Sequence, residues 1–177
     1  MLEVASEIED LQRLLDRSRS TATEHLRSII NDQRALSARD IVSLLTGMKV
    51  VALATVSARS EPRISAVDGH FLHGTWTWST SGTSAKARDL SSRPSVSVAH
   101  IDGEQLGVFA HGTAVRLHPS DPLWDETLDH WSAHYGGSPL NWGEDIRLYR
   151  LRLQWMVGYA FERDRLLAER LGERAER

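Results

Sequence analysis

The chain of 177 residues has no cysteine and a formal net charge of only −3. The absence of cysteine excludes disulfides, thiolate chemistry and cysteine-ligated zinc or iron–sulfur centres, so any metal would have oxygen and nitrogen ligands. No region of the sequence combines a basic face with regularly spaced aromatic residues. We therefore expect no nucleic-acid partner.

Long hydrophobic runs are also missing. No stretch approaches the about 20 apolar residues that a membrane-spanning helix needs. The N-terminal residues 1–7 are acidic and contain no long apolar run. We therefore expect a cytoplasmic protein with no membrane partner.

The eight histidines are the remaining candidates for metal ligands. His70 and His73 are three residues apart on a predicted strand, so their side chains should point to opposite faces. His130 and His134 share one face of a predicted helix, but no glutamate directly follows His130, as one does in the zinc-protease motif. We therefore predict no metal site.

The N-terminal part of the chain has the apolar spacing of helices. One apolar stripe runs along residues 2–17: Val4, Ile8, Leu11 and Leu15. A shorter apolar group indicates a second helix: Leu26, Ile29 and Ile30. Because so short a pair is not stable alone in water, it must pack on the rest of the chain or on a second copy. We divide the chain into an N-terminal helical arm, residues 1–36, and one domain, residues 37–177, that includes a C-terminal helix.

Besides the short helix that carries Lys86, helices are predicted in three places after the arm. Ser37 and Asp40 have the spacing of a capping box ahead of a helix over residues 38–46, which Gly47 can end. A second helix is expected over residues 120–135, where a proline stands near the first turn, and a third in the charged tail at residues 163–177.

The other residues have the alternating pattern of short strands. The Asp102-Gly103 pair is a strong signal for a tight hairpin turn. An aromatic strand begins at Trp76, and five more strands are indicated: residues 50–56, 62–67, 95–101, 105–115 and 150–157. Many short antiparallel strands among helices favour a small barrel, because closure removes exposed sheet edges. The expected fold class is α+β, mainly β: an antiparallel barrel with flanking helices and the N-terminal helical arm.

The segment at residues 76–90 is the strongest candidate for a binding site. It passes from the aromatic strand through a hydroxyl-rich loop with one glycine into a short helix that carries Lys86. Hydroxyls, free backbone N–H groups and the positive end of a helix together suit a phosphate, and a lysine can supply charge. Arg63 and Ser65 share one face of a nearby strand. Such loops also serve simply as turns and helix caps, and surface arginines are common, so the residues alone leave both interpretations open.

The order of these parts resembles the pyridoxamine 5'-phosphate oxidase-like family of flavin-binding split barrels. The resemblance covers about residues 38–160 and rests on four segments: residues 51–55, 62–65, 80–90 and 93–98. It implies an antiparallel split β-barrel that forms a homodimer with two flavin sites at the subunit interface, each lined by both chains. The N-terminal arm has no counterpart in this resemblance.

The resemblance also implies roles for individual residues. Carried over by position, Arg63 and Lys86 hold the cofactor phosphate, and three hydroxyl residues add hydrogen bonds: Thr80, Ser81 and Ser84. Four residues border the isoalloxazine ring, largely through the strand backbone: Ile64, Ser65, Trp78 and Ser79. Three residues are candidates for what the second chain contributes to the flavin site: Trp142, Arg150 and Trp155. For the two tryptophans, packing in the core or at the dimer interface is the alternative.

The implied function is that of a flavin-dependent oxidoreductase that uses FMN to move a hydride to or from a small substrate. No catalytic side chain is predicted, because the chemistry resides in the cofactor ring. Residues 158–161 show no counterpart of the arginine and histidine pair of true pyridoxamine phosphate oxidases, so that specific reaction is not expected. One alternative is a reductase that uses a deazaflavin coenzyme of the F-420 type. The other is a non-catalytic flavin- or haem-binding protein, in which His70 or His111 would matter; haem ranks behind the flavins.

Overall fold

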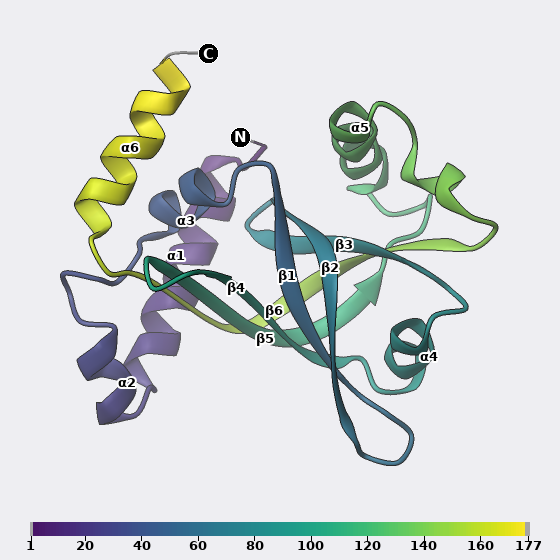
Figure 1. Cartoon of the computed structure of the whole chain (residues 1–177), viewed down its shortest axis with the longest axis horizontal. Helices are drawn as coiled ribbons and strands as arrows, with labels where there is room; N and C mark the ends of the chain where they lie inside the picture. Colours follow the sequence, from purple (N-terminus) through teal and green to yellow (C-terminus); the bar gives the residue numbers. More distant parts are fainter. Residues whose placement is uncertain (1, 176–177) are drawn as a thin grey trace.

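The structure is a computed structural model, and it describes residues 2–175 (Figure 1). Six antiparallel strands close into one barrel in the order β1-β2-β3-β6-β5-β4. Their bounds are β1 Met48–Val56, β2 Pro62–Leu72, β3 Thr75–Ser81, β4 Ser95–Asp102, β5 Leu106–Arg116 and β6 Ile146–Ala160. The helices are α1 Ala5–Ser20, α2 Glu24–Ile29, α3 Ala38–Leu44, α4 Ala85–Ser92, α5 Trp124–Tyr135 and α6 Arg163–Ala175, with a 3₁₀ turn η1 at Pro139–Trp142. The predicted class, an α+β antiparallel barrel with flanking helices, is confirmed.

The core forms because the inward-facing residues of the strands are apolar. Val51 and Leu53 on β1 are fully buried, as are Trp76 and Trp78 on β3. Helix α3 adds a compact apolar group to this core: Ile41, Val42, Leu44 and Leu45. The core is therefore shared between the barrel and the helices that pack on it.

Helix α3 starts as its capping box predicts. The Asp40 N–H donates to the Ser37 hydroxyl at 3.2 Å, and the Ser37 N–H donates to the Asp40 carboxylate at 2.9 Å. Helix α5 begins at Trp124 rather than near residue 120, because the preceding residues form turns; the Trp124 N–H donates to the Asp121 carbonyl at 3.0 Å. The start predicted for this helix was therefore a few residues too early.

Strands β3 and β6 pair over only part of the length of β6, so the barrel is open on one side beyond this pairing. Strand β3 has 7 residues and β6 has 15, and their pairing ends at Thr77 and Arg150. The remainder of β6 thus has an edge that β3 does not cover. Helix α1 lies along this part of β6, and the Ser18 hydroxyl accepts the Met156 N–H at 3.0 Å.

The last residues of the arm continue this cover. The Leu36 N–H donates to the Gly158 carbonyl at 3.0 Å, and the Ala160 N–H donates to the Arg34 carbonyl at 2.9 Å. The arm therefore packs on the barrel of its own chain and bonds to the edge of β6, where an unpaired strand edge would otherwise be exposed. The division of the chain at residue 36 stays a prediction.

One outer face of the barrel is apolar and exposed. Val50 on β1, Ile64 on β2 and Ile101 on β4 have exposed fractions of 59%, 76% and 58%. In Figure 1 the helices lie to either side of β1 and β2, with α1 to α3 and α6 on the left and α4 and α5 on the right. Patches of this kind often mark a protein interface.

Within residues 2–175, no helix is both long enough and apolar enough to cross a membrane. The cytoplasmic location stays a prediction.

Candidate functional site

Three predicted phosphate-binding residues meet at the start of α4. Ser84 is the N-cap, and its hydroxyl accepts the Ala87 N–H at 3.2 Å. The Thr80 hydroxyl lies 3.1 Å from the Ser84 hydroxyl, and the Lys86 ammonium lies 3.5 Å from the Thr80 hydroxyl. Ser84 therefore caps the helix, as the alternative interpretation held. The Ser84 hydroxyl also contacts the Thr80 hydroxyl, which lies beside the Lys86 ammonium. We call Thr80, Ser84 and Lys86 the cradle.

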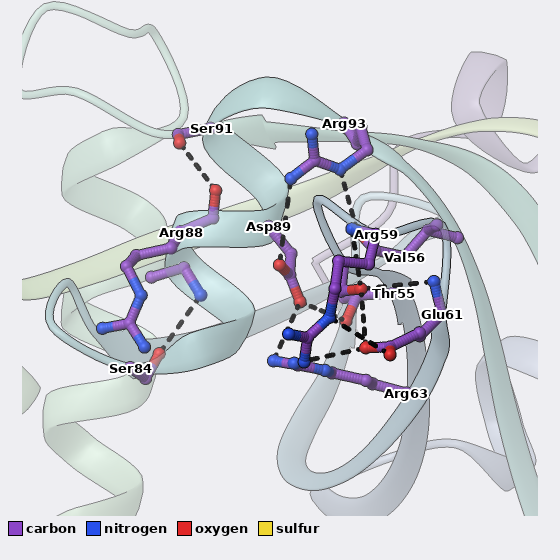
Figure 2. A network of polar contacts seen from close by, with 12 residues as sticks. Thr55, Val56, Arg59, Glu61, Arg63, Ser84, Arg88, Asp89, Ser91 and Arg93 are labelled. Atoms are coloured by element: carbon purple, nitrogen blue, oxygen red, sulfur yellow. Dashed lines mark hydrogen bonds and ion pairs between the residues drawn. The ribbon is translucent and has the colours of Figure 1, made fainter.

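Arg63 approaches α4 from β2 (Figure 2). Its guanidinium lies 3.9 Å from a carboxylate oxygen of Asp89 and 3.9 Å from one of Glu61. Asp89 is buried and also accepts the Thr55 hydroxyl at 3.3 Å, while Arg93 lies 4.0 Å from its other oxygen. Since the buried carboxylate lies between two arginines, it positions Arg63 on the α4 side of β2.

The cradle loop has a further cationic neighbour that the sequence interpretation missed. Arg147 on β6 is paired with Thr80 across the sheet and donates twice to Asp145, at 3.1 and 2.7 Å. The Arg147 guanidinium holds the pKa of Asp145 below its usual range. The Gly82 N–H donates to the Asp145 carbonyl at 2.6 Å, and a Cβ on Gly82 would lie 1.9 Å from the Asp145 carboxylate. The single glycine of the loop, Gly82, was the one sequence signal that another part of the chain comes close here. The sequence does not show that this part is Asp145 and Arg147.

The predicted ring-bordering residues lie in different surroundings. Ile64 is on the exposed apolar face, whereas Ser65 is half-buried on β2. The Trp78 side chain is in the core and stacks on Tyr149, with ring centroids 5.8 Å apart. Ser79 is half-buried and points to the opposite face of β3 from Trp78. Because the prediction for these four residues concerned mainly the strand backbone, the directions of their side chains do not test it, and it stays a prediction.

Ser81 holds the cradle loop in shape. Its hydroxyl lies 2.8 Å from the Thr83 hydroxyl and accepts the Thr83 N–H at 3.2 Å. Arg88 donates to the Thr83 carbonyl at 2.7 Å, from the second turn of α4. Ser81 is thus engaged within the loop, next to the three residues of the cradle.

A histidine cluster that the sequence interpretation missed lies between β2 and α5. His70 is fully buried, with its Nδ1 3.2 Å from His130 Nε2 and its Nε2 3.4 Å from the Tyr135 hydroxyl. The His134 ring packs edge-on at 4.9 Å, and Tyr135 donates to Asp68 at 3.1 Å. Burial, with the two other histidines nearby, lowers the pKa of His70 to about 3.

Within residues 2–175, no group of three or more histidine, aspartate or glutamate side chains is arranged to hold a metal ion. His73 lies outside the cluster, in the turn after β2, with a φ of 53° and with Glu7 and Glu126 at 3.1 and 3.3 Å.

The other candidates lie on the barrel strands β5 and β6 and on the 3₁₀ turn η1. His111 is exposed, with its Nδ1 2.8 Å from the Ser97 hydroxyl and its ring stacked on Trp155 at 4.7 Å. Trp142 is 49% exposed beside Tyr135. Arg150 is half-buried in a groove between α1 and β6. Of the two histidines considered for haem, only His111 is accessible.

The family is shown by comparison with known sequences. The family model described as pyridoxamine 5'-phosphate oxidase matches residues 38–156, which is more than half of the chain. The chain belongs to this family. The suspected resemblance is thereby confirmed, and the matched residues include the cradle, Arg63 and α4. No curated protein sequence matches the chain significantly.

Solved structures share the fold of this family member at low sequence identity. The conserved hypothetical protein Rv2991 from Mycobacterium tuberculosis is 18% identical with a TM-score of 0.63, covering 75% of this chain and 90% of that one. The heme storage protein HutZ from Vibrio cholerae is 21% identical with a TM-score of 0.57, covering 70% and 96%. A structure described as F420 reductase is 21% identical with a TM-score of 0.52, covering 64% and 93%. At such identities the likeness concerns the fold alone.

Proposed function

We propose that this protein is a flavin-dependent oxidoreductase that binds FMN, with the cofactor phosphate in the cradle. The observation that carries the proposal is the meeting of Lys86 with the Thr80 and Ser84 hydroxyls at the start of α4, in a chain of this family. Among residues 2–175, Lys86 makes no ion pair. The first N–H groups of a helix also lack intrahelical partners, so the donors present fit a phosphate.

Each residue of the site has a distinct task in this proposal. Lys86 supplies charge and Thr80 and Ser84 supply hydrogen bonds, which fix the phosphate and thereby the position of the ring. Arg63 adds a second cation, oriented by Asp89. FMN, when bound, supplies the hydride chemistry, so the protein needs no nucleophile of its own.

The proposal includes a homodimer that closes over the exposed apolar face. A hollow of about 530 Å³ on this face is lined by β1, β2 and β4. Ile64, which follows Arg63 directly on β2, lines this hollow. A second copy seated there would bury this surface and contribute Trp142 or Trp155, while a small-molecule substrate would enter at the interface.

The first experiment is an absorbance spectrum of the purified protein followed by titration with FMN and with a deazaflavin coenzyme. We expect FMN to bind tightly to the wild type and at least tenfold more weakly to Lys86→Ala, because one charge-assisted contact contributes about 1.5–3 kcal/mol. Arg39→Ala is the matched control, since Arg39 is an exposed cation on α3, and should not change affinity. Equal FMN affinity for wild type and Lys86→Ala removes the lysine from the site.

The same titrations distinguish the alternative cofactors. Preferential binding of the deazaflavin would assign the cradle to a deazaflavin-dependent reductase. Haem binding is favoured by one observation, the exposed His111 beside Trp155 on the outer face of the barrel. A Soret band that is lost in His111→Ala, without flavin binding, would support a haem-binding protein instead.

A further inference from the structure

A second group of cations lines the groove between α1 and β6. The groove has a volume of about 520 Å³ and lies where β6 has separated from β3. Its charged residues, apart from His73, are four arginines and two carboxylates: Arg13, Arg17, Arg150, Arg152, Glu7 and Asp10. Positive charge is therefore in excess.

The two carboxylates are already engaged. Asp10 forms an ion pair with Arg13, one turn along α1. Glu7 accepts from His73 at 3.1 Å and from the Val4 N–H at 2.9 Å. Three arginines remain: Arg17, Arg150 and Arg152. Within residues 2–175, the guanidinium of none of these three takes part in an ion pair or a hydrogen bond.

The three arginines enclose the groove from two sides. Arg150 and Arg152 are two residues apart on β6, so they leave the same face of the strand about 7 Å apart. Arg17 stands on α1, which forms the other wall. Because Arg150 is half-buried, its charge is less screened by water than that of a surface arginine. An oxyanion with two or more negative charges would relieve the repulsion among the three guanidinium groups.

We propose that this groove binds the phosphate group of a small phosphorylated molecule. The guanidinium fork matches the geometry of phosphate oxygens, and the groove has room for a small ligand. A nucleic acid fits less well, because the exposed side of α1 carries Glu9, Asp10 and Asp16 next to the groove. The N-terminal arm acquires a role in this way: it supplies one wall of a site.

The groove is separate from the cradle. Thr75, at the start of β3, lines the groove, whereas Thr80, near the end of the same strand, belongs to the cradle. Five residues of extended strand span about 17 Å, so one phosphate cannot occupy both sites. The inference therefore does not depend on the proposed flavin function.

The test is a calorimetric titration of the full-length protein with pyrophosphate at low ionic strength. It is run in the Lys86→Ala background, so that the cradle contributes little. We expect one equivalent to bind, and the added pair Arg150→Gln and Arg152→Gln to weaken binding at least tenfold. Arg39→Gln is the matched control and should change the affinity by less than twofold, because this exposed arginine lies on α3, outside the groove.

Each other outcome overturns the assignment. Loss of pyrophosphate binding in Lys86→Ala alone would mean that only the cradle binds phosphate, which would leave the flavin proposal intact. If the Arg150 and Arg152 double variant binds pyrophosphate as tightly as the parent, the groove is not the binding site. If citrate binds as tightly as pyrophosphate, the site is not specific for phosphate. If circular dichroism shows that the double variant is unfolded, Arg17→Gln replaces it. Arg17 is exposed on α1, and we expect its loss to weaken binding about threefold.

Discussion

At the scale of single residues, buried polar groups organise both sides of β2. Asp89 is a buried carboxylate with an arginine about 4 Å from each of its oxygens, which is how a buried charge is kept compensated. His70 is buried without a charged partner and is instead held by histidine and tyrosine side chains. His70 therefore stays neutral in the folded protein near neutral pH.

The neutral state of His70 makes stability depend on pH. The pKa of His70 is about 3 in the folded protein and about 6.5 in the unfolded chain, so between these values the unfolded state binds the proton more tightly. The free energy of unfolding therefore keeps its full value above pH 6.5, as far as His70 is concerned. Below pH 6.5 it falls by about 1.4 kcal/mol per pH unit until about pH 3. The lowered pKa of His130 acts in the same direction.

Urea unfolding at pH 7.5, 6.5 and 5.5 measures this effect. We expect the wild type to lose stability below pH 6.5 and His70→Gln, which cannot titrate, to show a smaller loss. His25→Gln is the control, because His25 is exposed on α2. Parallel pH profiles for wild type and His70→Gln would show that the buried imidazole is not the group responsible.

At the scale of elements, the arm substitutes for a missing stretch of β3. Strand β6 continues well beyond the last pair with β3, and α1 with the residues before α3 bonds to its backbone there. A buried N–H group without a partner costs about 1–3 kcal/mol, so this cover favours the folded state. The arm therefore stabilises the folded barrel through its hydrogen bonds to β6, although it adds no strand to the sheet.

Ser18→Ala tests the cover of β6 directly. Ser18 is buried and accepts the Met156 N–H, so its removal leaves this N–H without a partner and should lower the free energy of unfolding by about 1–3 kcal/mol. Ser20→Ala, on the same helix but exposed, is the control and should change it by less than about 0.5 kcal/mol. Chemical denaturation measures both. Equal effects of the two substitutions would contradict the role given to Ser18.

At the scale of the whole molecule, helices lie around much of the barrel but leave the outer face of β1, β2 and β4 exposed. The three large apolar residues there are more than half exposed, and they surround a hollow. A second copy of the chain seated on this face would bury these three residues. The homodimer is therefore the assembly that we propose.

Ile64→Glu tests this assembly. A charge at the centre of an apolar interface should prevent association, while the monomer should keep its stability because Ile64 is 76% exposed. Light scattering should show a dimer for the wild type and a monomer for the variant, with identical circular dichroism spectra. Ile29→Glu, at the end of α2, is the control and should remain dimeric. A dimeric Ile64→Glu would place the interface elsewhere.

Local features of the protein follow from the sequence alone. The capping box at Ser37 depends on neighbouring residues and occurs where the sequence predicts it. The hairpin at Asp102-Gly103 also forms, but its turn is one residue longer than the predicted two-residue turn, because Asp102 pairs with Leu106 and residues 103–105 make the turn. The period-two strands and the order of strand, loop and helix in the cradle follow for the same reason. The barrel and its family could therefore be predicted from the order and spacing of residues.

Contacts between distant residues were decided only by the tertiary structure. His70 and His130 are 60 residues apart, and Ser18 and Met156 are 138 apart, yet each pair is in hydrogen-bond contact. Strand register, the position at which β3 begins and the path of α1 determine such contacts, and none of these leaves a periodic signal in the sequence. For the same reason, the arginine groove could not be predicted: its walls come from opposite ends of the chain and meet only because the barrel splits between them.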